Sequence, residues 1–578
     1  MNCTGISNDR PLIQEEIHQL LHDNFSPSKV NNILWDAIVI GSGLSSLTLS
    51  KVLSASGYKV LILEQHDRAG GSCHTFKLDE FEFDVGLHYV QNMYSGRQLF
   101  KICSAITDSY CQWQKMDDPV DMVIINGQRY GRTAGDMKEF QSSLKNWFPD
   151  ESDNIDKFFD YSYQCMKEIP WLFRAKFMPL IIYKILTKFN IFDKLTNIFR
   201  CIQETLFEIM SKYNLSPQLQ CVISSYAANY GVSPNQASFL QHMLFFMENG
   251  YYPIGGANIL TSSIIRSINK FGGKVLVKAN VREITFDGNR RVNGVIVDYG
   301  SSRVFIRSPL VVSTASIVRT FNELIPTPTA KTSFMFSIAN ELYSKDVVKR
   351  GGMQAYIGLL GTRNDLNLPS NNFFWFKTND IFENSRYLSL KTMDEVIDYG
   401  CPPSMYISFP SAKDPGWSAR HPNVSTCQII SLANPEWFSE FQNLRNDRSR
   451  KRKNKEKYLL LKNTIGNYLV DMVTELFPSI KNEIIFKEFS TPLTQKYYLQ
   501  NMHGELYSLT HQVDRFQSNY WPYLRIKTDL PGFFCSGQDV LFCGVSSALH
   551  SGLLTASSIL HRDLYKDLEN AYLIQTKK

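Results

Sequence analysis

A short glycine turn between two apolar segments is the feature that most constrains how this chain can fold. Residues 37–40 are apolar and predict a buried parallel strand, and residues 45–56 predict a following helix. Gly41, Gly43 and Ser46 lie at this junction in a Gly-x-Gly-x-x-Ser pattern. Gly41 permits the sharp turn, and Gly43 lets the backbone approach a pyrophosphate at the helix N-terminus. The pattern predicts a strand–turn–helix unit of the Rossmann type.

An acidic residue at the end of the next strand supports a dinucleotide site. Residues 59–63 predict that strand, and Glu64 follows it at about 20 residues from the glycine turn, where a carboxylate hydrogen-bonds ribose hydroxyls. Its negative charge disfavours a 2′-phosphate. We include Ser42, between the two glycines, among the residues that contact the nucleotide. An ordinary tight turn followed by a surface glutamate is the alternative reading.

A second glycine pair favours FAD over NAD. Arg68, Gly70 and Gly71 follow Glu64 in an Arg-Ala-Gly-Gly segment. In two-domain flavoproteins, such a pair lets backbone amides approach the phosphates and flavin of FAD, whereas NAD-binding Rossmann domains have no such requirement. We therefore expect FAD as the cofactor.

Two later segments are expected to complete the FAD site. Val281 and Ala315 lie before and after an apolar strand at residues 310–313, and we expect both beside the adenosine half of FAD. Gly537 and Asp539 follow another short strand, where the Asp539 carboxylate could accept hydrogen bonds from the ribityl chain or from adjacent backbone.

The helix expected after Asp539 carries a stripe of small residues. Gly544, Ala548 and Gly552 are spaced by four and share one helix face. The stripe fits close approach to a flavin ring, and it equally fits plain helix–helix packing.

The order of these segments predicts an α/β fold with two domains. One is a Rossmann-type FAD-binding domain built from discontinuous segments, with an inserted α+β domain that binds the substrate or lipid. The FAD-binding segments are residues 33–100, 250–330 and 529–568. The substrate-domain segments are residues 101–249 and 331–528, and residues 1–32 are expected to be a polar lead-in.

Composition excludes several other classes of protein. The formal net charge of +6 over 578 residues is too small to indicate a nucleic-acid partner. The 11 cysteines include no Cys-x-x-Cys pair, which argues against a disulfide framework or a metal site. Residues 1–10 are polar and no uninterrupted apolar run reaches about 18 residues, so we expect neither a signal peptide nor a transmembrane span.

A mixed apolar and basic segment bears on membrane contact. Residues 173–199 combine Phe, Ile, Leu and Met with Lys and Arg. This composition fits helices lying on a bilayer surface, and it fits equally a buried helical cap over a substrate channel. We expect peripheral membrane contact.

Several motifs resemble the retinol saturase family, which is related to carotenoid isomerases and phytoene desaturases. They are Leu-Glu-Gln-His-Asp at 63–67, Gly-Gly-Ser-Cys-His-Thr-Phe at 70–76 and Gly-Leu-His-Tyr at 86–89. The resemblance spans residues 34–568. The chain departs from the family pattern at Ser46, where members often carry glycine, and at Ser72, where they often carry cysteine.

The resemblance implies a reaction and a cellular site. It implies FAD-dependent saturation of one C=C bond of a retinoid, of the all-trans-retinol to 13,14-dihydroretinol type, with NAD or NADP as candidate electron donors. It also implies a peripheral position at the endoplasmic reticulum membrane. Alternatives are a carotenoid or prenyl-lipid desaturase or isomerase, an amine oxidase, and a non-catalytic prenyl-binding chaperone of related fold.

Four aromatic residues are candidates for the substrate pocket, although each could equally be an ordinary core residue. They are His88, Tyr89, Tyr251 and Tyr498. The sequence identifies no catalytic acid and predicts no oligomeric state.

Overall fold

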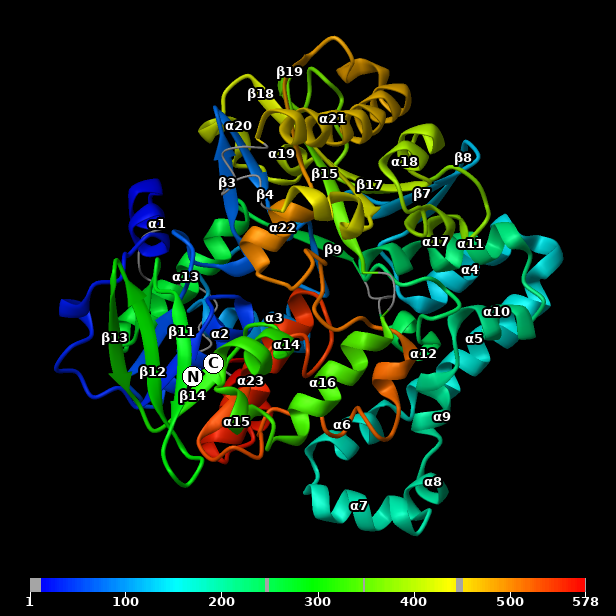
Figure 1. The fold of residues 1–578 in the computed structure, drawn as a ribbon. Coiled ribbons are helices and arrows are strands. Elements are labelled where there is room, and N and C mark those ends of the chain that lie inside the picture. The colour runs from blue at the N-terminus through cyan, green and yellow to red at the C-terminus, as the bar shows by residue number, and fades with distance from the viewer. Residues whose placement is uncertain (1–11, 245–248, 347–348, 443–450, 577–578) are drawn as a thin grey trace.

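A five-stranded parallel sheet forms the centre of the nucleotide-binding half of the protein. The computed structural model describes residues 12–244, 249–346, 349–442 and 451–576 (Figure 1). The strand order is β10-β2-β1-β14-β20, and every neighbouring pair is parallel. The strands are β1 (Ala37–Ile40), β2 (Val60–Leu63), β10 (Lys274–Leu276), β14 (Val311–Ser313) and β20 (Phe533–Cys535). Strands β1, β2 and β20 are continuous apolar runs, as expected of parallel strands that are covered on both faces.

Helices cover this sheet at very close range. Helix α2 (Leu44–Ala55) packs between α13 (Ala257–Lys270) and α23 (Val545–Leu560). A Cβ atom at Gly552 of α23 would lie 2.5 Å from the Ser45 carbonyl oxygen. The last member of the small-residue stripe therefore serves helix–helix packing.

The N-terminal segment is more structured than a polar lead-in. Helix α1 (Gln14–Leu21) packs against α13, and its Ile17 and Leu21 side chains are buried in the core around the parallel sheet.

A three-stranded antiparallel sheet also joins this core. Its strands are β11 (Val281–Phe286), β12 (Val292–Tyr299) and β13 (Ser302–Arg307).

A separate seven-stranded mixed sheet forms the second half. Its order is β19-β15-β18-β17-β16-β7-β8, with β16 and β7 parallel and the other pairs antiparallel. The strands are β7 (Asp121–Ile125), β8 (Gln128–Arg132), β15 (Gly351–Leu360), β16 (Asn372–Phe376), β17 (Ser404–Ser408), β18 (Val424–Ala433) and β19 (Ile484–Ser490). This mixed sheet beside the parallel one confirms the predicted α/β class.

A group of helices extends away from the mixed sheet. They are α5 (Ser152–Met166), α6 (Ile169–Phe177), α7 (Leu180–Lys188), α8 (Ile191–Leu195) and α9 (Ile198–Gln203). Figure 1 shows α7 and α8 projecting from one end of the molecule, while α21 (Lys451–Leu476) lies at the opposite end beside the mixed sheet. Across the described ranges, no helix is both long and apolar enough to cross a bilayer.

Candidate functional site

A large cavity lies where the parallel strands end. Its volume is about 1470 Å³, above the roughly 300–1,000 Å³ typical of a small-molecule pocket. It begins at the carboxyl ends of β1, β2, β14 and β20, where open α/β sheets bind ligands, and reaches strands β15 to β19 of the mixed sheet. The cavity therefore has room for a dinucleotide and a second ligand.

The first glycine turn forms one wall of this cavity. Gly41 has φ +91°, and a Cβ atom there would lie 2.8 Å from the Thr314 hydroxyl oxygen. Gly43 has φ −67°, and a Cβ atom there would meet nothing within 4 Å. The first glycine is thus required by the fold, whereas the second leaves an open surface at the start of α2. A phosphate group fits that open surface.

The Glu64 carboxylate is held in place by the turn. One of its oxygens accepts hydrogen bonds from the Ser42 amide (3.1 Å) and hydroxyl (2.6 Å), and the other accepts from the His66 amide (3.0 Å). The Ser42 hydroxyl also accepts from the Gly70 amide at 3.0 Å. Ser42 and Glu64 line the cavity, whereas Gly70 is not among its lining residues.

The second glycine pair brings two turns into contact. Gly71 has φ +57°, and a Cβ atom there would lie 2.9 Å from the Gly43 Cα. Arg68 also lines the cavity, and its guanidinium donates to the Thr75 carbonyl and to the His22 ring. The close backbone contact explains why this segment needs glycine.

The later FAD-site candidates reach the same cavity. Val281, Ala315, Gly537 and Asp539 all line it. The Asp539 carboxylate accepts hydrogen bonds from the backbone amides of Ile317 (2.7 Å) and Leu509 (3.3 Å). Of the two partners expected for Asp539, the structure shows the adjacent backbone.

The N-terminus of α23 also faces the cavity. Gly544, the residue before the helix, and Val545 and Ala548 of its first turn line the wall. The positive end of the helix dipole stabilises negative charge at this position. The small-residue stripe is thus divided between the cavity (Gly544 and Ala548) and packing against α2 (Gly552).

The four expected substrate residues do not lie together. His88 and Tyr89 line the cavity near the mixed sheet. Tyr498 also lines it, but its side chain is half exposed and its ring lies 5.2 Å from that of His66, near the Glu64 end. Tyr251 is not among the lining residues; its ring stacks on that of Tyr94.

A buried polar network beside the cavity was not anticipated from the sequence. Lys413 donates hydrogen bonds to the Ser408 hydroxyl (2.7 Å), the Asn372 side-chain oxygen (2.5 Å) and the His88 carbonyl (2.8 Å). The Tyr406 phenol, which lines the cavity, donates to the same Asn372 oxygen at 2.6 Å. Asn372 therefore holds the Lys413 ammonium beside a phenol on the cavity wall.

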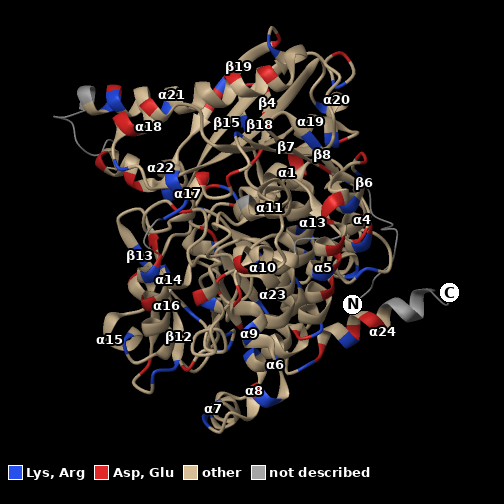
Figure 2. Cartoon of the chain, turned by 90° about the vertical axis from the view of Figure 1, so that its right-hand side faces the viewer, with Lys and Arg blue, Asp and Glu red and all other residues tan. Residues whose placement is uncertain are grey.

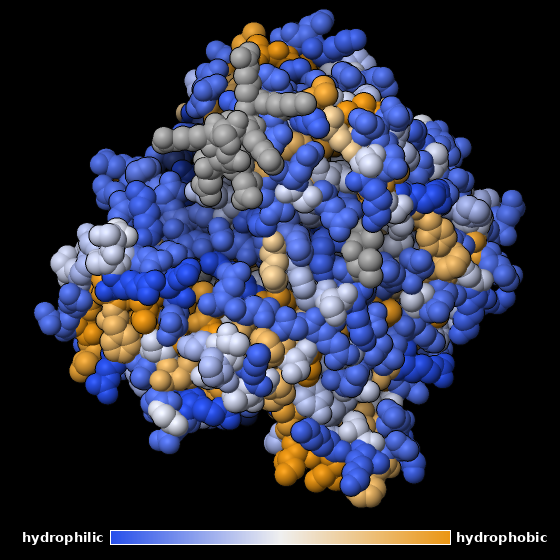
Figure 3. Space-filling view, viewed as in Figure 1, coloured by the Kyte–Doolittle hydropathy of each residue, from blue (hydrophilic) through white to orange (hydrophobic). Residues whose placement is uncertain are grey.

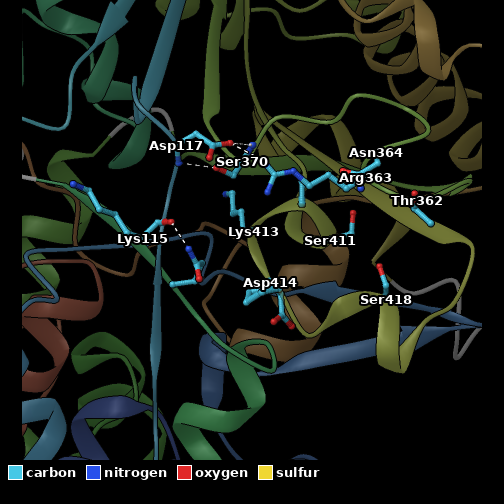
Figure 4. Close-up of a pocket in the computed structure, with 13 residues that line it drawn as sticks. Lys115, Asp117, Thr362, Arg363, Asn364, Ser370, Ser411, Lys413, Asp414 and Ser418 are labelled. Atoms are coloured by element: carbon cyan, nitrogen blue, oxygen red, sulfur yellow. Dashed lines mark hydrogen bonds and ion pairs between the residues drawn. The ribbon is translucent and has the colours of Figure 1, made fainter.

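Lys413 also borders a second, polar cavity. Figure 4 shows Lys413 at the wall of this cavity of about 350 Å³, which Ser411, Asp414 and Arg363 also line. Burial lowers the pKa of Lys413 to about 7, an effect that Asp84 and Asp121 partly offset. Burial also raises the pKa of Asp84 to about 7. Both groups can exchange protons near neutral pH.

The residues at the nucleotide end fit FAD. The open Gly43 surface and the α23 N-terminus can accept negative charge, and the fixed Glu64 carboxylate can accept ribose hydroxyls. Among the residues described, no group of His, Cys, Asp and Glu is arranged to hold a metal.

A family model and a solved structure both resemble this protein in fold. Residues 39–106 match the family model described as an NAD(P)-binding Rossmann-like domain. A solved structure of putrescine oxidase superposes with a TM-score of 0.55 at 14% identity, covering 92% of this chain and 100% of that one. The protein therefore has a Rossmann-like domain of the NAD(P)-binding type and shares its overall fold with putrescine oxidase.

Sequence relatives then define the family. The chain is 33% identical to all-trans-retinol 13,14-reductase of Danio rerio, covering 95% of this chain and 89% of the relative. It is 31% identical to a second Danio rerio protein, named inactive all-trans-retinol 13,14-reductase, over 100% and 94% of the two chains. Prolycopene isomerase of Daucus carota is 24% identical over 81% and 71%. The chain belongs to the all-trans-retinol 13,14-reductase, or retinol saturase, family.

Proposed function

We propose that the protein is an FAD-dependent reductase that saturates one C=C bond of a retinoid. The observation that carries this proposal is the single cavity that joins the Glu64 end to an apolar chamber walled by Phe374, Ile430 and Leu541. A polyene offers few hydrogen-bonding groups, so such a chamber would bind it through apolar contact.

We propose that one set of residues holds FAD. Bound there, FAD would supply hydride to one olefin carbon, with NAD or NADP as the candidate source of electrons. The Asp539 carboxylate would hold the Ile317 and Leu509 loops that border the cofactor, and Gly70 would hold Ser42. The proposed residues are Gly41, Ser42, Gly43, Glu64, Arg68, Gly70, Gly71, Val281, Ala315, Gly537 and Asp539.

We propose His88, Tyr89 and Tyr406 as substrate contacts, with Tyr406 supplying the proton that reduction requires. Burial raises the pKa of Tyr406 well above its ordinary value, which keeps the phenol protonated. Asn372 accepts hydrogen bonds from both Tyr406 and Lys413, and the Lys413 ammonium beside the phenol can stabilise the phenolate that remains after the proton is given up. Burial lowers the pKa of His88 to about 3, so its ring is neutral and serves as a contact only.

Product analysis distinguishes this reaction from the alternatives. Incubation of the flavin-loaded protein with all-trans-retinol under reducing conditions is expected to give a product heavier by two hydrogen atoms. Its absorbance should be shifted to the blue, because saturation shortens the conjugated chain. A desaturase would give a lighter, red-shifted product from a more saturated lipid, and an isomerase would leave the mass unchanged. Unchanged retinol in the presence of reduced flavin would reject retinol as the substrate.

Flavin content distinguishes the proposed reductase from a non-catalytic prenyl-binding chaperone. The chaperone alternative predicts a folded protein that takes up no flavin, whereas the proposal predicts retained FAD.

The family resemblance also supports a proposed peripheral position at the endoplasmic reticulum membrane.

A further inference from the structure

Exposed apolar side chains gather on one projecting part of the molecule. The structure describes 20 large hydrophobic side chains that are exposed, and seven of them lie between residues 177 and 195. They are Phe177, Ile181, Ile182, Ile185, Phe189, Ile191 and Leu195. In Figure 3, hydrophobic side chains (orange) gather at the projecting end of the molecule, where Figure 1 places α7 and α8. We call this group the α7–α8 surface.

The inner face of α7 already has its partners. Tyr183 is buried, donates a hydrogen bond to the Ser518 carbonyl at 2.8 Å, and packs its ring against Phe192 and Phe199. Ile181 and Ile185, which lie on the outer side, are 70% and 50% exposed. Helix α7 therefore needs no further packing for its own fold, and its outer apolar face is available to something else.

Basic residues border the same surface. Lys184, Lys188 and Lys194 are exposed on α7 and α8, with Asp193 as an exposed acid between them. Figure 2, in which Lys and Arg are blue, shows basic residues on the projecting helices α7 and α8. An apolar face bordered by lysines complements a bilayer with anionic headgroups, because the apolar side chains enter the interface and the ammonium groups meet phosphate.

The α7–α8 surface continues into the large cavity. Ile169, Phe173 and Phe177 follow one another at four-residue spacing on α6, and all three line the cavity wall. Phe177 belongs both to the α7–α8 surface and to the cavity wall, since it lines the cavity and is 42% exposed beside α7. A lipid leaving a bilayer at this point would first meet the apolar side chains of Phe177, Phe173 and Ile169.

We propose that the α7–α8 surface docks the protein on an anionic bilayer and that its lipid enters the cavity beside Phe177. Docking is independent of the proposed reaction; only the entry route rests on the proposed lipid substrate. The proposal combines both alternatives for residues 173–199: α6 would cover the cavity, and α7 and α8 would face the membrane.

Vesicle flotation of the full chain tests the docking. The wild type is expected to float with phosphatidylcholine vesicles that contain about a third phosphatidylserine, and more weakly with phosphatidylcholine alone. Ile181→Ser with Ile185→Ser should weaken binding to both kinds of vesicle about tenfold or more, because two inserted side chains are lost. Lys184→Glu with Lys188→Glu should remove the preference for anionic vesicles.

A matched control uses an exposed apolar pair far from this surface. Leu459 and Leu460 of α21 are 36% and 53% exposed at the opposite end of the molecule, so Leu459→Ser with Leu460→Ser should float like the wild type. Failure of the wild type to float, or equal loss in this control, would overturn the proposal. So would a dimer that the Ile181 and Ile185 changes dissociate without any vesicle binding. Because the assay needs no turnover, its result is separate from that of the proposed reaction.

Discussion

The Ser42 hydroxyl lies 2.6 Å from a Glu64 carboxylate oxygen, and the Ser42 backbone amide lies 3.1 Å from the same oxygen. These two bonds join the turn after β1 to the end of β2. They fix the orientation of the carboxylate before a cofactor arrives, so the site is preorganised rather than assembled on binding.

Removal of the Ser42 hydroxyl should therefore weaken FAD binding. Ser42→Ala leaves the carboxylate one hydrogen bond short and leaves the Gly70 amide without its acceptor. We expect FAD affinity to fall about tenfold, as for the loss of one charge-assisted hydrogen bond. Fluorescence titration with FAD measures this. Ser46→Ala is the control, because the Ser46 hydroxyl bonds Thr314 instead; an equal loss of affinity in both variants would contradict the assignment.

Gly43→Val should give a folded protein without FAD. The backbone at Gly43 suits any residue and a Cβ atom there meets nothing, so the fold accepts the change. The valine side chain would occupy the surface proposed for the pyrophosphate, and we expect at least about a hundredfold loss of FAD affinity. Circular dichroism and the visible flavin spectrum measure the two properties. Gly288→Val, also in open space but away from the cavity, should retain FAD.

The Lys413–Asn372–Tyr406 network predicts a pH dependence of turnover. Since burial lowers the pKa of Lys413 to about 7, the ammonium form that can stabilise the Tyr406 phenolate is present below that pH and is lost above it. The rate should fall as the pH rises through about 7. Tyr406→Phe should reduce turnover about a hundredfold with unchanged flavin content. Tyr356→Phe, another cavity tyrosine, should keep both the rate and the pH profile; a similar loss in Tyr356→Phe would remove the special role of Tyr406.

Asp539 should matter for stability as well as for the cofactor. Asp539→Ala leaves the buried Ile317 and Leu509 amides without their acceptor, at roughly 1–3 kcal/mol for each unsatisfied group. Asp539→Asn keeps an oxygen acceptor and should lose less. Thermal unfolding of the flavin-free proteins separates this effect from cofactor binding. Equal stability of the wild type and Asp539→Ala would show that these two hydrogen bonds contribute nothing.

The sequence predicted the Rossmann elements because their determinants are local. An apolar run such as residues 37–40, a glycine turn and a carboxylate after the next strand are each contained in a short window. The helix of residues 14–21 was missed because only Ile17, Leu21 and a few neighbours face the core, so the segment reads as polar.

The network around Tyr406 depends on pairing that no local pattern records. Asn372 and Tyr406 approach one another because β16 pairs with β17 in a register that places Phe374 opposite Tyr406. Lys413 reaches them from the end of the short helix α19 (Pro410–Lys413), which follows β17. Tyr251 shows the same limit in reverse. It was predicted as a pocket residue, but the sequence did not specify which side of its strand, β9 (Gly250–Pro253), faces the cavity.

In the proposed reaction, electrons pass from a bound flavin to a polyene lipid inside one cavity. A single turnover without oxygen tests this step: the FAD-loaded protein is reduced and then mixed with all-trans-retinol. We expect the flavin absorbance to return at the same rate as the retinol absorbance is lost, and both rates to fall together in Tyr406→Phe. Retinol that stays intact while the flavin stays reduced would reject the proposed electron transfer.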